Sequence, residues 1–320
     1  MIPMLATLTR RHLLAAPAVA LAAPGAVAAP APAFRFCLNT STVRLPQGDW
    51  GKPRPLAESI AVAREAGYAA VEPWVGEVDE YVAGGGTLAE LAKRFADAGL
   101  AVPDLIGFAE WVCDDDARRK KGLEQAKRDM DKARQLGCAQ MAAPPVGATG
   151  GGSRRDDPRS SPPVAPQAAA DRYRALLDLG KGMGVTPLVE LWGHSRTLSR
   201  LGEAWLVAAD CGAAGGAVLP DVYHLYKGGS DFAGLGLLSG AAVGIFHVND
   251  YPKLDRAAIK DQDRVFPGDG VAPLGEVAAA LRRIGYGGFL SLELFNRTYW
   301  QRDPLAVARE GLDKLKAVMG

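Results

Sequence analysis

Residues 184–191 read Gly-Val-Thr-Pro-Leu-Val-Glu-Leu, and this stretch holds the pattern that decides the fold. Before it, residues 168–183 place apolar side chains at helical spacing, and Gly184 stands where a helix commonly ends. The short apolar run that follows, with its β-branched residues, predicts a buried strand that finishes on the acidic Glu190. The stretch therefore predicts a helix, a glycine and a strand in immediate succession.

The same unit recurs along the chain from Phe34 onward, where further glycines stand between amphipathic segments and apolar runs. These glycines are Gly67, Gly99, Gly137 and Gly285. The expected strands are residues 35–40, 69–73, 102–108, 139–143, 186–191, 217–221, 244–249 and 289–294. The expected helices are residues 56–66, 88–98, 117–136, 168–183, 202–213, 274–284 and 304–318, with a glycine-rich one near 230–239.

Eight such units predict an α/β fold, a single-domain (β/α)₈ TIM barrel over residues 34–320. Parallel strands need crossover connections, and the crossover helices then cover the outside of the sheet. An open, doubly wound sheet is the alternative. No G-x-G-x-x-G follows the first expected strand, which disfavours that alternative.

Residues 1–33 have the layout of an export signal. Arg10 and Arg11 precede a long stretch of Ala, Leu, Val and Pro that carries no charge and ends in small residues. This layout predicts a signal peptide, and the paired arginines resemble a twin-arginine leader, so we expect a periplasmic protein. A retained transmembrane helix is the alternative, which the prolines within the stretch disfavour.

Composition narrows the classes of partner. The 320 residues include 37 Lys+Arg and 36 Asp+Glu, so the chain is close to neutral and shows no electrostatic reason to bind nucleic acid or an anionic membrane. The four cysteines are scattered without a C-x-x-C pair, which predicts buried free thiols and not a zinc cluster or a disulfide scaffold. A small-molecule ligand is therefore expected, and a homo-oligomer remains open.

One connection is longer than is usual in a barrel. Residues 147–166 are rich in Gly, Ser, Arg, Asp and Pro and follow the fourth expected strand. Long loops of this kind are either functional covers or structureless. A mobile substrate cover is one interpretation of this loop, and a disordered segment is the other.

Four residues of metal-binding type end four successive expected strands. They are Glu190, Asp221, His247 and Glu293. In a barrel the C-terminal ends of the strands converge on one mouth, so these distant residues become neighbours. Three carboxylates and one imidazole form an oxygen-rich site, for which Mn²⁺ is expected first and Mg²⁺, Co²⁺ or Zn²⁺ are the alternatives.

From residue 34 to its end, the chain resembles the xylose-isomerase-like barrel superfamily, also described as the sugar phosphate isomerase/epimerase group. The resemblance is carried by Val-Glu-Leu-Trp-Gly-His-Ser at 189–195, Asp-Val-Tyr-His at 221–224, Phe-His-Val-Asn-Asp at 246–250, Pro-Gly-Asp-Gly at 267–270 and Leu-Ser-Leu-Glu-Leu-Phe-Asn at 290–296. It implies one divalent ion on the four residues above. It also implies that Glu190 and Glu293 are the catalytic acid/base pair, and that His224 contacts a substrate oxygen.

Four further residues near strand ends are candidates for substrate binding. Glu72 ends the second expected strand, and Trp74 beside it offers a flat surface on which a sugar could stack. His194 and Lys253 lie just beyond the ends of the fifth and seventh expected strands. For Glu72 and Trp74, a role in packing is the alternative.

The expected chemistry is the removal of a proton next to a carbonyl, with the enediolate stabilised by the metal ion. A sugar isomerase or epimerase is the first hypothesis. A 3-keto-glycoside lyase or deglycosidase that ends in β-elimination is the second, and an exported enzyme would meet such glycosides. A noncatalytic sugar-binding barrel is the third, although both candidate catalytic glutamates are present. A DNA-repair endonuclease with a three-zinc cluster is disfavoured, because few histidines are available.

Overall fold

The computed structural model describes residues 33–148 and 162–320. The expected leader at 1–33 and the central part of the long loop at 147–166 lie outside these residues, apart from residue 33 itself. The described chain contains eight strands. They are β1 (Arg35–Asn39), β2 (Ala70–Glu72), β3 (Leu105–Ile106), β4 (Gln140–Ala143), β5 (Thr186–Glu190), β6 (Ala217–Leu219), β7 (Ile245–Val248) and β8 (Phe289–Leu292).

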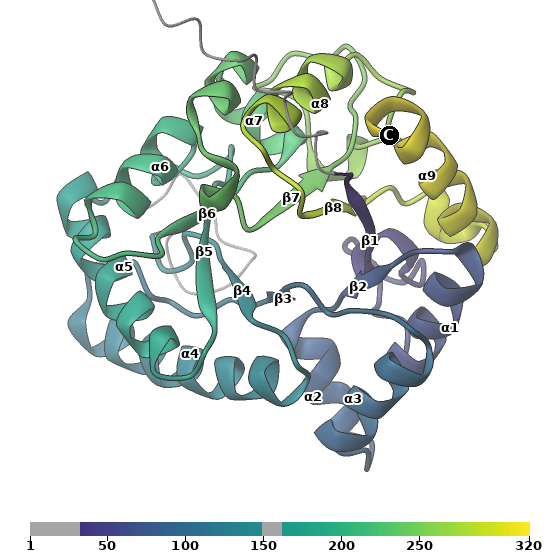
Figure 1. Ribbon diagram of the computed structural model, residues 1–320, viewed down its shortest axis with the longest axis horizontal. Coiled ribbons are helices and arrows are strands. Elements are labelled where there is room, and N and C mark those ends of the chain that lie inside the picture. The colour runs from purple at the N-terminus through teal and green to yellow at the C-terminus, as the bar shows by residue number, and fades with distance from the viewer. Residues whose placement is uncertain (1–32, 149–161) are drawn as a thin grey trace, which may run out of the picture. The chain divides into compact units, whose positions relative to one another are not determined.

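The eight strands form one closed parallel barrel, as the sequence predicts (Figure 1). Two four-stranded parallel sheets, ordered β2-β1-β8-β7 and β3-β4-β5-β6, supply most of the pairing. Parallel bridges between Trp74 and Ile106, and between Asp221 and His247, join the sheets at both seams. The second of these bridges brings two expected metal ligands side by side.

Helices surround the strands (Figure 1). They are α1 (Leu56–Ala66), α2 (Val75–Ala83), α3 (Leu88–Asp97), α4 (Asp116–Gln135), α5 (Pro166–Lys181), α6 (Leu201–Asp210), α7 (Val222–Gly228), α8 (Leu274–Arg283) and α9 (Pro304–Met319). Gly67 ends α1 with a φ of 92°, the left-handed conformation expected of a terminal glycine.

The structure differs from the sequence expectation around two helices. After β2 the chain forms α2, which lies outside the expected helices. After β6 it forms α7 directly, and the glycine-rich stretch expected as a helix contains only a 3₁₀ helix at Phe232–Leu237. Asp221 caps α7 by accepting a hydrogen bond from the backbone N–H of His224 at 2.7 Å, which explains the early helix start.

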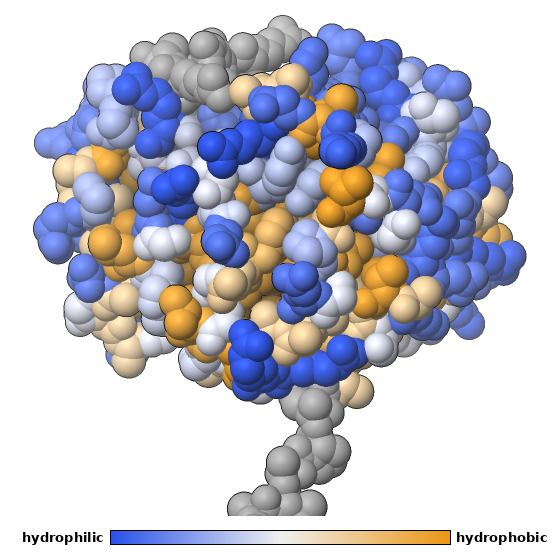
Figure 2. Space-filling view, turned by 90° about the horizontal axis from the view of Figure 1, so that it is seen from above, coloured by the Kyte–Doolittle hydropathy of each residue, from blue (hydrophilic) through white to orange (hydrophobic). Residues whose placement is uncertain are grey.

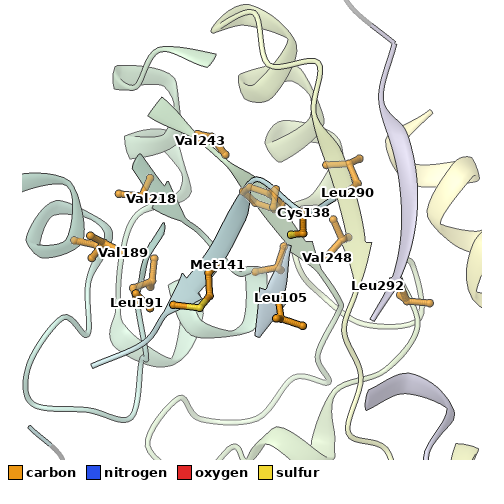
Figure 3. Packing of buried hydrophobic residues seen from close by; sticks show 14 of the residues in the cluster. Leu105, Cys138, Met141, Val189, Leu191, Val218, Val243, Val248, Leu290 and Leu292 are labelled. Carbon is orange, nitrogen blue, oxygen red and sulfur yellow. The ribbon is translucent and has the colours of Figure 1, made fainter. Parts of the chain in front are cut away.

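Alternation along the strands separates two layers of buried side chains. Leu188, Leu219 and Ile245 belong to the cluster inside the barrel. Val189 and Val218 belong to the larger cluster between strands and helices, part of which Figure 3 shows. Because side chains alternate along a strand, each inward residue is followed two positions later by another inward residue. This spacing determines which strand-end side chains enter the mouth.

The four cysteines are free and buried, as expected. Figure 2 shows charged and polar side chains over much of one face, with apolar side chains between them. Within residues 33–148 and 162–320, no helix is long and apolar enough to cross a membrane.

Candidate active site and metal centre

The expected ligands continue the inward row at the C-terminal ends of the strands. Glu190 follows the inward Leu188 by two positions, and Asp221 follows the inward Leu219 in the same way. His247 and Glu293 complete the set. All four are at most 4% exposed, so four ionisable groups are held together in a site from which water is largely excluded.

Three of the four form a compact group that could hold a metal ion. Asp221, His247 and Glu293 each offer a ligand atom, and these atoms lie within 4.8 Å of one another. The Nδ1 atom of His247 lies 3.2 Å from Oε2 of Glu293 and 3.9 Å from Oδ2 of Asp221. Nδ1 is buried without a hydrogen-bond partner among the described residues, so a cation can bind this nitrogen by displacing its proton. Glu190 lies outside this group of three.

Glu72 sits behind the metal group and orients His247. Its Oε1 atom is 2.9 Å from Nε2 of His247, while Oε2 accepts hydrogen bonds from Ser291 at 2.6 Å and from Asn39 at 2.8 Å. A carboxylate on one ring nitrogen holds the proton there and directs the other nitrogen to the metal. Glu72 is fully buried and is not part of the pocket wall. The chemistry of this site therefore fits a divalent ion.

Arg264 is a site residue that no strand-end motif of the sequence predicts. Its Nη1 donates to Oδ2 of Asp221 at 3.0 Å and to Oε2 of Glu293 at 2.8 Å. Its Nη2 donates to Asp261 at 2.7 Å, and the residue is 1% exposed. The arginine thus compensates the clustered carboxylates and touches two of the expected metal ligands. The sequence signal that could have indicated Arg264 is its position just before the Pro-Gly-Asp-Gly motif at 267–270.

A carboxylate-centred loop holds Arg264 in place. Asp250 and Val265 exchange two backbone hydrogen bonds, of 3.0 and 2.9 Å. The side chain of Asp250 accepts backbone N–H bonds from Gly268, Gly270 and Ala272 at 2.9 to 3.1 Å. A Cβ at Gly270 would lie 2.3 Å from this carboxylate, so only glycine allows the loop to close around it.

Burial and neighbouring charges shift the pKa values of the carboxyl groups in opposite directions. Burial raises the pKa of Glu190 to about 8, against the lowering effect of His247. Burial would also raise the pKa of Glu293, but His247 and Arg264 outweigh it and lower that pKa to about 2. Glu293 is therefore held ionised, whereas Glu190 can exist in either protonation state near neutrality.

The two histidines differ in charge. Burial opposes the imidazolium of His247, but Glu72 and Glu293 outweigh this effect and raise its pKa well above the usual range. Burial and Arg264 lower the pKa of His224 well below its usual range. Nδ1 of His224 accepts a hydrogen bond from the backbone N–H of Gly193 at 3.2 Å, and Nε2 lies 3.3 Å from Nη2 of Arg264. His224 is therefore a neutral ring beside the site.

Asp104, immediately before β3, is a further buried acid, and it does not stand at a strand end where the sequence predicts site residues. It is fully buried, and neither carboxyl oxygen has a hydrogen-bond partner among the described residues. Burial, followed by the charge of Glu72, raises the pKa of Asp104 well above its usual range. An apolar barrel interior favours the neutral acid at this position.

A pocket of about 260 Å³ adjoins the group, and Glu293 forms part of its wall. Its walls are formed by Arg44, Trp50, Trp74, Ile106, Phe108, Glu190, Trp192, His194, His224, Asp261, Arg264, Glu293 and Phe295. Of the expected substrate contacts, Trp74, His194 and His224 line the pocket, whereas Lys253 is exposed and outside its wall. The aromatic side chains give the pocket flat apolar faces beside charged groups, which is the usual composition of a small-molecule site.

Comparison with known proteins agrees with this architecture. The chain is 24% identical over 216 residues to an inosose isomerase of Bacillus velezensis, covering 67% of this chain and 74% of the relative. It is 25% identical over 268 residues to a 3-dehydroshikimate dehydratase of Pseudomonas aeruginosa, covering 81% of this chain but 39% of that protein.

Among solved structures, the IOLI protein with a bound zinc atom superposes with a TM-score of 0.78 at 20% identity, over 89% of this chain and 98% of that one. A D-psicose 3-epimerase superposes with a TM-score of 0.69 at 19% identity, over 90% of this chain and 100% of that one. Residues 60–318 match the family model described as xylose isomerase-like TIM barrel. The chain therefore belongs to the xylose isomerase-like TIM barrel family, as its strand-end motifs predict.

Proposed function

We propose that this protein is a divalent-metal-dependent isomerase or epimerase that removes a proton next to the carbonyl of a sugar or cyclic polyol. The observation that carries the proposal is the buried group of Asp221, His247 and Glu293, with an imidazole nitrogen that has no hydrogen-bond partner among the described residues, beside an aromatic pocket whose wall includes Glu293. The named activities of the relatives, inosose isomerase and D-psicose 3-epimerase, support the same class of reaction.

In this proposal Asp221, His247 and Glu293 hold the ion. The donor set suits Mn²⁺ first, and the zinc atom in a structural neighbour supports Zn²⁺ as an alternative to Mg²⁺ and Co²⁺. When bound, the ion supplies Lewis acidity that makes the hydrogen next to the carbonyl easier to remove. Glu72 keeps the imidazole of His247 turned toward this position.

Glu190 is the proposed base. It lines the pocket, and its Oε1 accepts a hydrogen bond from the indole N–H of Trp192 at 3.0 Å, which fixes the carboxylate toward the substrate. It takes the proton from the substrate carbon and returns it to the adjacent carbon in isomerisation, whereas epimerisation needs a return to the other face. Glu293, which also lines the pocket, is the second carboxylate for that return; because it is held ionised, it first takes a proton from solvent and then delivers it to the carbon, and Glu190 releases its own proton to solvent. His224 and Arg264 border the space for the substrate oxygens.

A lyase is the second candidate, and the apolar walls favour it. Trp74, Phe108 and Trp192 form a chain of aromatic contacts, with ring centroids 5.2 and 6.3 Å apart, that could accept a bulky substituent. The substrate of this lyase would be a 3-keto-glycoside. The proton leaves C2, a C1=C2 double bond forms, and the C1 substituent departs with the bonding electrons and gains a proton. The 3-dehydroshikimate dehydratases among the relatives support an elimination on this barrel.

Exchange of the substrate's α-hydrogen with deuterated water tests both candidates, because both begin with the same proton removal. Mn²⁺-loaded protein would be incubated with inososes, free ketoses and a synthetic 3-keto-glucoside, and followed by NMR. Exchange with an isomer as product supports the isomerase, whereas release of the glycoside's substituent supports the lyase. Absence of exchange on all three substrate classes would refute the proposed function.

A further inference from the structure

The pocket wall contains a buried arginine that the chemistry above does not use. Arg44 follows β1 and the short 3₁₀ helix Thr40–Val43, lines the pocket and is 3% exposed. Its guanidinium carbon lies 4.3 Å from the ring centroid of Trp74 and 5.7 Å from that of Phe295. The guanidinium is therefore held against aromatic faces at the edge of the substrate space.

The hydrogen bonds of Arg44 leave one edge of the guanidinium unsatisfied. Nη1 donates to the backbone oxygen of Trp50 at 2.9 Å. The buried Nε has no hydrogen-bond partner among the described residues, and no described carboxylate lies within the 4.0 Å that would define an ion pair with Arg44. The Nε and Nη2 groups share the edge that points away from Nη1, and this edge can bind a carboxylate or phosphate through two parallel bonds.

Other arginines of this chain show what the same edge does when an anion is present. Arg118 uses Nε and Nη2 to bind the two oxygens of Glu110 at 3.0 and 2.8 Å. Arg264, equally buried, has three carboxylate partners, among them Asp261. A buried guanidinium without such a partner is costly, because carboxylates beyond ion-pair distance, here Glu77 and Glu293, compensate the loss of water only in part. Arg44 therefore lacks a directly bound anion that would compensate its burial.

We propose that Arg44 binds an anionic group of the substrate, so that the preferred substrate is a sugar acid or a sugar phosphate. The inference rests on the proposed function for the place of the reacting carbonyl, near Glu190 and Glu293. Arg44 and Arg264 both approach Phe295, with guanidinium carbons 5.7 and 5.0 Å from its ring centroid. One substrate in this pocket can therefore reach the metal group and Arg44 together.

Binding of unreactive ligands tests the inference separately from catalysis. The probes are D-glucitol, D-gluconate and D-glucitol 6-phosphate, which share a six-carbon polyol chain and differ in a neutral, carboxylate or phosphate end. Calorimetric titrations would be made in EDTA, so that the anions cannot bind to a metal ion. Hydrogen bonds to a charged group predict that one of the anions binds about 10- to 100-fold more tightly than D-glucitol.

Arg44→Met should abolish this preference, and Arg44→Lys should retain part of it because the charge remains while the planar edge is lost. Arg297→Met is the matched control, because Arg297 is half exposed, pairs with Asp49 at 3.3 Å and lies outside the pocket wall. It should leave the preference unchanged. Circular dichroism verifies that each variant is folded, and the wild-type and Arg44→Lys titrations decide the question if Arg44→Met is not.

Equal affinity for all three probes in the wild type would overturn the inference, as would a preference for an anion that survives in folded Arg44→Met. If D-gluconate binds more tightly, the preferred substrate is a sugar acid; if D-glucitol 6-phosphate binds more tightly, it is a sugar phosphate. Exchange assays on D-fructose, D-fructuronate and D-fructose 6-phosphate provide the catalytic counterpart. Absence of exchange on all three counts against the proposed function while leaving the binding result valid, whereas exchange without preference for either anion counts against the role of Arg44.

Discussion

Two isosteric substitutions separate the proton carrier from the metal ligands. Glu190→Gln keeps an oxygen that can accept the bond from Trp192 Nε1, at 3.0 Å in the wild type, but removes the basic carboxylate. Asp221→Asn changes a residue whose Oδ2 accepts bonds from Asn249 and Arg264 and faces Nδ1 of His247. We expect the first substitution to remove turnover and the second to weaken metal binding.

The structure indicates the magnitudes. General-base catalysis typically contributes about 10²- to 10⁴-fold, so α-hydrogen exchange by Glu190→Gln should fall by that factor at unchanged metal content. In Asp221→Asn, the amide can keep its oxygen toward Arg264 only by turning its NH₂ toward the backbone N–H of His224, which removes a helix cap worth about 1 kcal/mol. Replacement of a ligand should cost at least the 10- to 100-fold in metal affinity that substitutions behind the ligands cause.

The assay combines metal content, from elemental analysis after dialysis, with α-hydrogen exchange at increasing Mn²⁺. Excess Mn²⁺ should restore part of the activity of Asp221→Asn and none of that of Glu190→Gln. Parallel loss of metal and activity in Glu190→Gln would show that Glu190 is a fourth ligand, as its strand-end position suggested. Exchange at the wild-type rate would show that the base is another group, with Glu293 the first to be examined.

Three further predictions follow from the buried charges and the leader. Arg264→Met should lower the free energy of unfolding of the metal-free protein by about 3–5 kcal/mol, because Asp221 and Glu293 lose the cation that pairs with them. In Mn²⁺ the loss should be smaller, and calorimetry that gives equal losses in EDTA and in Mn²⁺ would contradict this. Because the pKa of Asp104 is raised in the folded state, the wild type loses stability as pH rises above the unfolded-state pKa of about 4 and until the folded-state pKa is passed. Asp104→Asn should therefore gain stability relative to the wild type as pH rises above about 4, and urea titrations showing a pH-independent difference would refute this. We also propose export by the twin-arginine route: Arg10→Lys with Arg11→Lys should leave precursor in the cytoplasm, and unchanged processing on fractionation would indicate another route.

Local sequence was enough to predict the barrel and most of the strand-end residues. Each strand is a short apolar run, and a glycine such as Gly67 marks the end of the helix before it. Both signals lie within a few residues of each other, so they can be recognised without knowledge of the tertiary structure. The acid of Val-Glu at 189–190 and the His of Phe-His at 246–247 lie at positions that the two-residue alternation turns inward. Parallel closure then brings such strand ends to one mouth, whatever their separation along the chain.

The glycine-rich stretch expected as a helix shows the limit of such local signals. A side-chain cap at Asp221 begins α7 immediately after β6, and the chain has already turned before the glycines are reached. Hydropathy alone does not reveal which of two adjacent segments forms the helix, because the cap depends on the conformation of the residue that makes it.

Only the tertiary structure determined which positive charges lie at the site and how the acids are grouped around them. Arg264 reaches Asp221 because a backbone pair with Asp250 and the turn at Gly270 fix its loop. Arg44 reaches the pocket because Trp74 and Phe295, from opposite ends of the barrel sequence, pack around it. Such contacts join loops whose course depends on the whole closed sheet, and the pKa of each buried group depends on charges brought near only by that closure.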